Sequence, residues 1–210
     1  AGPLKVTPIA TLEVDMGRYG VDGMTTDSWL NTVVFMKAWD ILLSEEVYRR
    51  HDWVVKVDPD TVFFPGRLRP VLAGLHSERV DDRAVYLLNC DKTFAATDKF
   101  KTKLFGALEV YSRKAVEAYE AGAISCQNEL DWHGWGEDFF MQSCMTMLNV
   151  SARAELGMLS DNRCVASPCS DQGKVAFHTF KNVSTYFQCW NESLGPAAVS
   201  AFEAARPAIA

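Results

Sequence analysis

Two aspartates separated by one proline are the first residues whose spacing suggests chemistry. Asp58 and Asp60 follow an apolar run at 53–57, and a second apolar patch begins at Val62. A β-branched run of this length predicts a buried strand, and in an open α/β sheet ligands bind beyond the carboxyl ends of strands. Paired carboxylates there would hold Mg²⁺ or Mn²⁺, which keep coordination positions for phosphates. We therefore predict a divalent metal on Asp58 and Asp60 that binds a diphosphate.

The same string has a plainer interpretation, because surface turns often contain two aspartates around one residue. Pro59 would then form an ordinary Asp-Pro turn, and Asp60 would cap the next segment. The apolar flanks on both sides favour the metal site, since buried carboxylates need a partner cation.

A second acidic pair, Glu137-Asp138, opens a predicted helix directly after the Gly134-Trp135-Gly136 loop. Acidic residues stabilise the first turn of any helix, so this position has an ordinary explanation. The functional interpretation is a general base, in which one carboxylate takes the proton of an attacking hydroxyl. The aromatic loop would then supply a wall on which a sugar stacks. Spacing alone does not separate the two interpretations.

His178 lies in the apolar run AFHTF and is the third candidate. A lone histidine in such a run is more often a core residue than a ligand. A neutral imidazole would nevertheless complete a metal site that carboxylates open. His51, His76 and His133 lack comparable flanks, and we expect them at the surface.

The segments that must position these residues alternate between strand-like and helix-like patterns, which predicts the α/β class. Strands are expected over residues 4–14, 53–57, 84–89, 105–111 and 174–180. Helices are expected from Asp27 or Ser28 to Leu43, and over residues 67–75, 112–119, 137–148 and 196–206. Ser112 would cap its helix, and Gly122 would lie beyond that helix's end.

Length and composition predict a single globular domain that spans residues 1–210. Hydrophobic residues make up 48% of the chain and charged residues 23%, as in ordinary globular proteins. The net charge of −6 gives no basic surface for nucleic acid, so no nucleic-acid partner is expected. No apolar span reaches membrane length, so membrane attachment is expected only through a segment absent from this chain.

The cysteines and glycosylation sequons favour a secretory, oxidising compartment. Sequons begin at Asn149, Asn182 and Asn191. The number of cysteines is even: Cys90, Cys126, Cys144, Cys164, Cys169 and Cys189. Their spacing does not match that of a structural zinc site. Cys164 and Cys169 share one loop and would be able to pair. The plainer alternative is that the thiols are buried as small hydrophobic groups.

Taken together, four segments resemble the fringe and β-1,3-galactosyltransferase group of GT-A glycosyltransferases. They read WVVKVDPDTVFFP, FGALEVYSRKAV, GWGEDFF with CMTMLNV, and AFHTFK, and the match runs from Leu30 to Lys181. The resemblance implies a GT-A-like, Rossmann-related mixed sheet flanked by helices. It also implies inverting transfer of a sugar from a nucleotide-sugar donor, such as a UDP-sugar, to a glycan or glycoprotein hydroxyl. Mn²⁺ (or Mg²⁺) would be the cofactor, and the Golgi lumen the location.

By position in this resemblance, three residues would serve the metal. Asp60 would be the principal ligand and His178 a further one. Asp58 would contact the metal or the donor ribose or sugar, directly or through water.

The resemblance assigns the remaining site residues to the transfer itself. Asp138 would be the catalytic base, with Glu137 as second choice. Gly106 and Ala107 would give the close backbone approach that a bound sugar needs.

The sequence departs from the pattern of this family in three respects. Pro59 stands where an acid is commoner, and Gln142 or Ser143 stands where a glycine is expected. Only residues 1–52 precede the first metal-site strand. We therefore expect an N-terminus truncated before the first strand of the fold, or residues 4–14 as its shortened replacement.

Two other functions compete with the transferase. A haloacid-dehalogenase-type phosphatase also uses an aspartate pair after a buried strand, although that strand normally starts its domain. A catalytically inactive GT-A-like binding or scaffolding module would explain a missing part of the nucleotide pocket.

Overall fold

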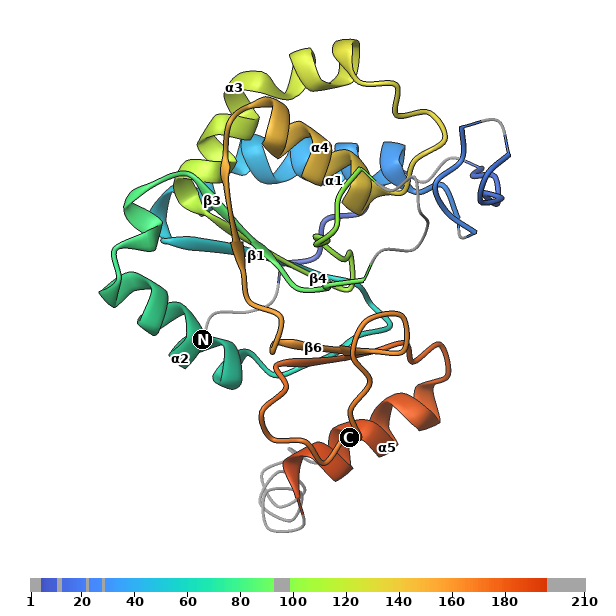
Figure 1. Cartoon of the computed structure of the whole chain (residues 1–210), viewed down its shortest axis with the longest axis vertical. Helices are drawn as coiled ribbons and strands as arrows, with labels where there is room; N and C mark the ends of the chain where they lie inside the picture. Colours follow the sequence, from blue (N-terminus) through green and yellow to red (C-terminus); the bar gives the residue numbers. More distant parts are fainter. Residues whose placement is uncertain (1–4, 11–12, 22, 28, 93–98, 196–210) are drawn as a thin grey trace.

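The computed structural model describes residues 5–10, 13–21, 23–27, 29–92 and 99–195. Its largest sheet has four strands in the order β1-β4-β3-β5 (Figure 1). These strands are β1 (Trp53–Val57), β4 (Leu108–Ser112), β3 (Val85–Leu88) and β5 (Ser151–Ala154). β4 is antiparallel to β1 and β3, whereas β3 and β5 are parallel. This mixed sheet with flanking helices confirms the α/β class and is compatible with a Rossmann-like fold.

Helices cover both faces of the large sheet (Figure 1). On one face lie α1 (Thr32–Glu45), α3 (Arg113–Glu129) and α4 (Glu137–Met147), and on the other α2 (Pro65–Ser77). Successive strand residues point to opposite faces. Tyr111 of β4 therefore packs against Trp39 of α1, whereas Val110 joins the cluster that contains Leu68 of α2. Every residue of β4 is buried as a result.

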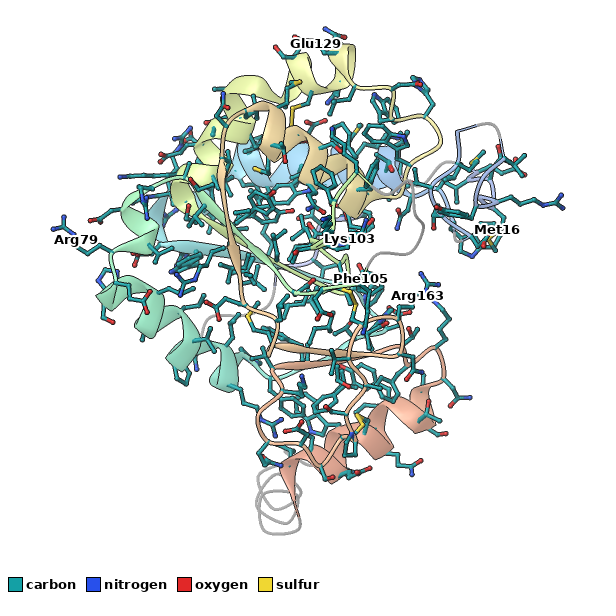
Figure 2. All side chains as sticks on the ribbon, in the orientation of Figure 1. Met16, Arg79, Lys103, Phe105, Glu129 and Arg163 are labelled. Atoms are coloured by element: carbon teal, nitrogen blue, oxygen red, sulfur yellow. A yellow bond between two sulfur atoms is a disulfide. The ribbon has the colours of Figure 1, made fainter. Side chains whose placement is uncertain are left out.

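A smaller sheet has three strands in the order β2-β7-β6. These are β2 (Val62–Phe63), β7 (Ala176–His178) and β6 (Leu159–Asp161), and α5 (Val183–Leu194) packs against them. β2 follows β1 after the turn that contains Asp58 and Asp60, so this turn lies where the two sheets meet. Phe105 lies near the same junction (Figure 2), with its ring centroid 6.1 Å from that of His178.

Local sequence signals explain several helix boundaries. Ser112 accepts a hydrogen bond from the backbone amide three residues later, which confirms the predicted cap of α3. Pro65 occupies the first turn of α2, where its missing N–H costs nothing. α3 continues past the expected end at Tyr119, because Gly122 is not a terminator. A Cβ at Gly122 would lie 2.2 Å from a methyl of Leu148, so the glycine permits close helix packing.

Other expectations are wrong or incomplete. The described part of residues 4–14 contains no strand; Pro8 lacks the N–H that a strand needs. α1 begins at Thr32, because the Asp27 carboxylate instead accepts a hydrogen bond from the Tyr19 amide. β2, β5, β6, α5 and two 3₁₀ turns, Val47–Arg50 and Val80–Asp82, were not predicted as such. The expected helix over 196–206 lies outside the described residues.

Three disulfides join the cysteines as Cys90–Cys164, Cys126–Cys144 and Cys169–Cys189. The pairing expected between Cys164 and Cys169 is therefore wrong. Their loop directs Cys164 to the end of β3 and Cys169 to α5, so each joins an element distant in sequence. Three disulfides indicate an oxidising, extracellular or secretory environment. Within the described ranges, no helix is long and apolar enough to cross a membrane.

Candidate metal and catalytic site

A pocket of about 940 Å³ opens at the junction of the two sheets. Its walls come from the ends of β1 and β7, the segment before β4, the starts of α4 and α5, and six residues nearer the N-terminus: Met16, Thr26, Asp27, Trp29, Asn31 and Phe35. All seven site residues predicted from the sequence line it: Asp58, Asp60, Gly106, Ala107, Glu137, Asp138 and His178. The fold thus brings together residues that are up to 120 positions apart (178 minus 58).

Asp58, Asp60 and His178 form the one cluster, among the described residues, that has metal-ligand geometry. One donor atom of each lies within 4.8 Å of the others, and Asp60 Oδ1 lies 3.5 Å from His178 Nε2. Two carboxylates and an imidazole suit divalent cations such as Mn²⁺. The donor set therefore fits the metal that the sequence predicts.

Backbone hydrogen bonds hold the aspartate turn from both sides. The Asp58 amide donates to the Ala107 carbonyl over 3.3 Å, and the Thr61 amide closes the turn onto the Asp58 carbonyl over 3.0 Å. The Phe180 amide donates to the Asp60 carbonyl over 2.8 Å. The turn is thus anchored both to the segment before β4 and to the segment after β7.

A lysine at the same end of the pocket balances the charge of Asp60. Lys181 Nζ lies 2.8 Å from Asp60 Oδ2, and the Lys181 side chain is 80% exposed. Burial raises the pKa of Asp60, but the hydrogen bond from Lys181 and the charge of His178 outweigh it and lower the pKa overall. Asp60 is therefore held as a carboxylate, the form that binds metal.

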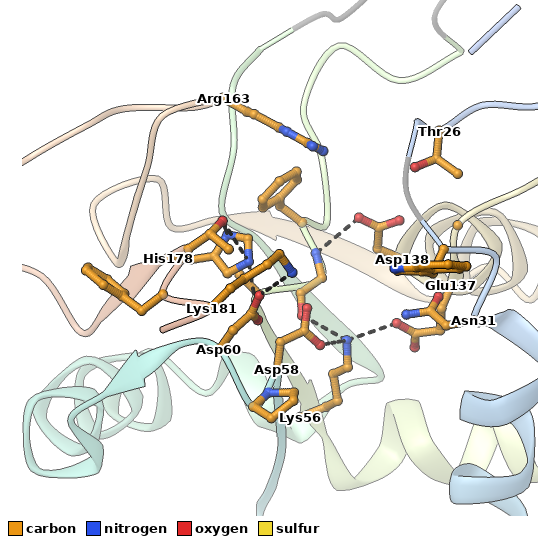
Figure 3. A pocket seen from close by; sticks show the side chains of 18 of the residues that line it. Thr26, Asn31, Lys56, Asp58, Asp60, Glu137, Asp138, Arg163, His178 and Lys181 are labelled. Atoms are coloured by element: carbon orange, nitrogen blue, oxygen red, sulfur yellow. Dashed lines mark hydrogen bonds and ion pairs between the residues drawn. The ribbon is translucent and has the colours of Figure 1, made fainter. Parts of the chain in front are cut away.

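Lys56 links the metal cluster to the acidic pair of α4 (Figure 3). Its Nζ lies 2.8 Å from Asp58 Oδ1, 3.0 Å from Glu109 Oε1 and 3.0 Å from Glu137 Oε2. It also donates to the Gly106 carbonyl over 2.8 Å. One ammonium group therefore joins the aspartate turn, the segment before β4, β4 itself and α4.

Burial would lower the pKa of Lys56, but the charges of Glu109, Glu137 and Asp58 hold it well above its usual value. Burial and the charge of Glu137 raise the pKa of Glu109, whose second oxygen accepts a hydrogen bond from Tyr111. These pKa directions favour a charged lysine beside a glutamate that readily keeps its proton.

The two acidic residues of α4 have different surroundings. Glu137 is 4% exposed, and its oxygens face Lys56 and the Trp39 indole N–H. Asp138 instead accepts hydrogen bonds from the amides of Gly106 and Phe139, over 3.1 and 2.8 Å. Burial raises the pKa of Asp138, and the charge of Glu137 raises it further. A raised pKa suits proton uptake near neutral pH, so Asp138 is the stronger candidate base.

Gly106 brings its backbone against both charged groups. A Cβ at this position would lie 3.4 Å from the Cβ of Asp138 and 3.5 Å from Lys56 Nζ. The adjacent Ala107 is buried and lines the pocket. Because Gly106 has no side chain and Ala107 has only a methyl group, neither residue fills the space between the aspartate turn and α4.

The aromatic wall differs from the expected one. Trp135 packs edge-on against Phe139, and Trp132 packs on Phe140 and His133. The tryptophan that lines the pocket is Trp29, which is 56% exposed.

Lys56, Glu109 and Asp161 are site residues that the sequence-based reasoning missed. Asp161 ends a buried strand and contacts His178. The sequence signal was weak, because only Met158 and Leu159 are apolar before Asp161 and a serine separates them from it. The expectation that His51, His76 and His133 are exposed is confirmed.

A comparison of the sequence with known protein families finds no match, and a comparison with curated proteins finds no significant similarity.

Proposed function

We propose that this chain is a GT-A-like glycosyltransferase domain of the inverting type. It would move a sugar from a nucleotide-sugar donor to a hydroxyl of a glycan or glycoprotein. The observation that carries the proposal is the pocket, in which Asp60 and His178 face Asp138 from the opposite side (Figure 3). A direct displacement at a sugar carbon needs a cation beside the leaving group and a base beside the attacking hydroxyl.

The metal end of the pocket supports donor binding. Asp60 and His178 would be the principal Mn²⁺ ligands, with Mg²⁺ as the harder alternative. Asp58 has one oxygen against Lys56, which leaves the other for the cation or the donor sugar. When bound, the cation neutralises charge on the departing diphosphate. We take a UDP-sugar as donor from the resemblance of the four sequence segments.

The base end supports acceptor activation. Asp138 would take the proton of the acceptor hydroxyl, while the amides of Gly106 and Phe139 hold its carboxylate in place. Glu137 would act through its ion pair with Lys56 instead of touching the acceptor. The disulfides and sequons are consistent with work on glycoproteins in the secretory pathway, and we propose the Golgi lumen.

A panel of UDP- and GDP-sugars with mixed glycan acceptors tests the proposal. We expect Mn²⁺-dependent release of a nucleoside diphosphate, and Asp60→Ala should lower the rate by about three orders of magnitude, because a metal supplies several kcal/mol of charge stabilisation. Asp82→Ala is the matched control, since Asp82 is an exposed acid that pairs with Arg79.

Two outcomes would contradict the transferase. If Asp60→Ala is as active as the parent, the metal-assisted mechanism fails. If the folded protein neither cleaves nor binds any nucleotide in the presence of Mn²⁺, the inactive binding module becomes the better explanation.

A further inference from the structure

Asp161 lies behind the histidine of the metal cluster. It ends β6 and is the register partner of His178 in β7. Its side chain is 3% exposed. Oδ2 lies 2.5 Å from His178 Nδ1, and Oδ1 accepts a hydrogen bond from the Arg163 amide over 2.6 Å. Both oxygens of this buried carboxylate therefore accept hydrogen bonds within the protein, one of them from the imidazole.

This contact determines which imidazole nitrogen is free. A carboxylate accepts hydrogen bonds only, so Nδ1 must carry the proton that it donates. In the neutral ring, the lone pair then lies on Nε2, the nitrogen 3.5 Å from Asp60 Oδ1. A carboxylate behind a ligand histidine also raises its basicity as a ligand.

We propose that Asp161 is a positioning residue, which fixes the tautomer and ring orientation of His178 and thereby sets the affinity of the cluster for a divalent cation. The inference rests on the metal site of the proposed function but not on sugar transfer. It explains why a buried carboxylate ends β6 beside the end of β7.

Thr179 is the other polar neighbour of the ring. Its hydroxyl lies 2.9 Å from Nδ1 and 3.1 Å from Nε2 of His178. A hydroxyl donates or accepts equally well, so it does not select a tautomer. Thr179→Val removes this hydroxyl at nearly constant shape and is therefore the matched control for Asp161.

The first measurement is the dissociation constant of Mn²⁺ alone, by calorimetry and by EPR of free Mn²⁺. Asp161→Asn should weaken binding by about 10–100-fold, because a single amide oxygen cannot serve both the Arg163 amide and the imidazole. Thr179→Val should change the constant by less than about 3-fold, below that range. Equal losses in the two variants, or none in Asp161→Asn, would overturn the proposal.

A double-mutant cycle separates positioning from simple structural support. In a His178→Ala background, Asp161→Asn should have no further effect on Mn²⁺ affinity. An undiminished further loss would mean that Asp161 supports the fold and not the ring.

Nitrogen NMR provides a readout that a structural role would not change. The chain has four histidines, so the His178 signals can be assigned by substitution. We expect the Nδ1–H tautomer in the parent at high pH and its loss in Asp161→Asn. Unaltered Mn²⁺ binding in that variant would refute this inference and leave the transferase standing; a parent that binds no Mn²⁺ would refute both.

Discussion

The two ends of the pocket are built in different ways. At the metal end, Asp60 and His178 are 18% and 15% exposed, and the balancing Lys181 is mostly in solvent. At the base end, Lys56 contacts Glu109 and Glu137, whose side chains are 0% and 3% exposed. The groups at the metal end remain accessible to a ligand, whereas most of the charged groups at the base end are paired with one another.

This difference distinguishes groups that are able to bind a ligand from groups that stabilise the fold. Ions that face a pocket can exchange protein partners for a ligand at modest cost. Buried ions that are paired with one another cannot, because each would leave an unpaired charge in a medium of low dielectric. We therefore expect changes at the metal end to affect ligands, and changes in the Lys56 cluster to affect folding.

The largest expected effect is on stability. Lys56→Met leaves the acidic groups of Asp58, Glu109 and Glu137 without their cation, and should lower the free energy of unfolding by about 3–5 kcal/mol. Lys181→Met is the matched control and should cost less than about 1 kcal/mol. Chemical denaturation of both variants measures the contrast. Equal destabilisation would remove the distinction between the two ends of the pocket.

The next effect separates chemistry from binding. Asp138→Asn should lower the transfer rate by about 10²–10⁴-fold through loss of the general base. Mn²⁺ affinity should stay unchanged, because Asp138 lies outside the metal cluster. The exposed Asp131→Asn serves as control. A large loss of Mn²⁺ affinity in Asp138→Asn would mean that both ends form one metal site.

The smallest effect sharpens the role of Glu137. Its charge raises the pKa of Asp138, so Glu137→Gln should lower that pKa. A base with a lower pKa stays deprotonated in more acidic solution, so the acid limb of the pH–rate profile should move to lower pH. The exposed Glu129→Gln, at the end of α3, should leave the limb in place. A rate loss as large as that of Asp138→Asn, without a shift of the limb, would instead make Glu137 the base.

Much of the site was predictable because its residues lie in or directly beside segments whose local pattern predicts a strand or a helix. Asp58 and Asp60 follow an apolar run, Glu137 and Asp138 start a helix, and His178 lies in an apolar run. Such signals depend on near neighbours in the chain, and each of these residues reached the same pocket.

The residues that were missed become important only through contacts with residues elsewhere in the chain, which the sequence pattern does not show. Lys56 reads as an ordinary polar position in a strand, and its importance depends on Glu109, which lies opposite it only through the register of β1 and β4. α5 was missed because its apolar side chains pack on the small sheet, which is itself assembled from three distant short strands.

The sequence by itself determined the α/β class, the Ser112 cap of α3 and the aspartate turn, because these follow from short-range pattern and backbone chemistry. Only the tertiary structure decided the disulfide partners, the cluster around Lys56 and the contact between Asp161 and His178. Each of these joins different elements of the chain, and strand register together with helix packing determines which buried charges and thiols meet.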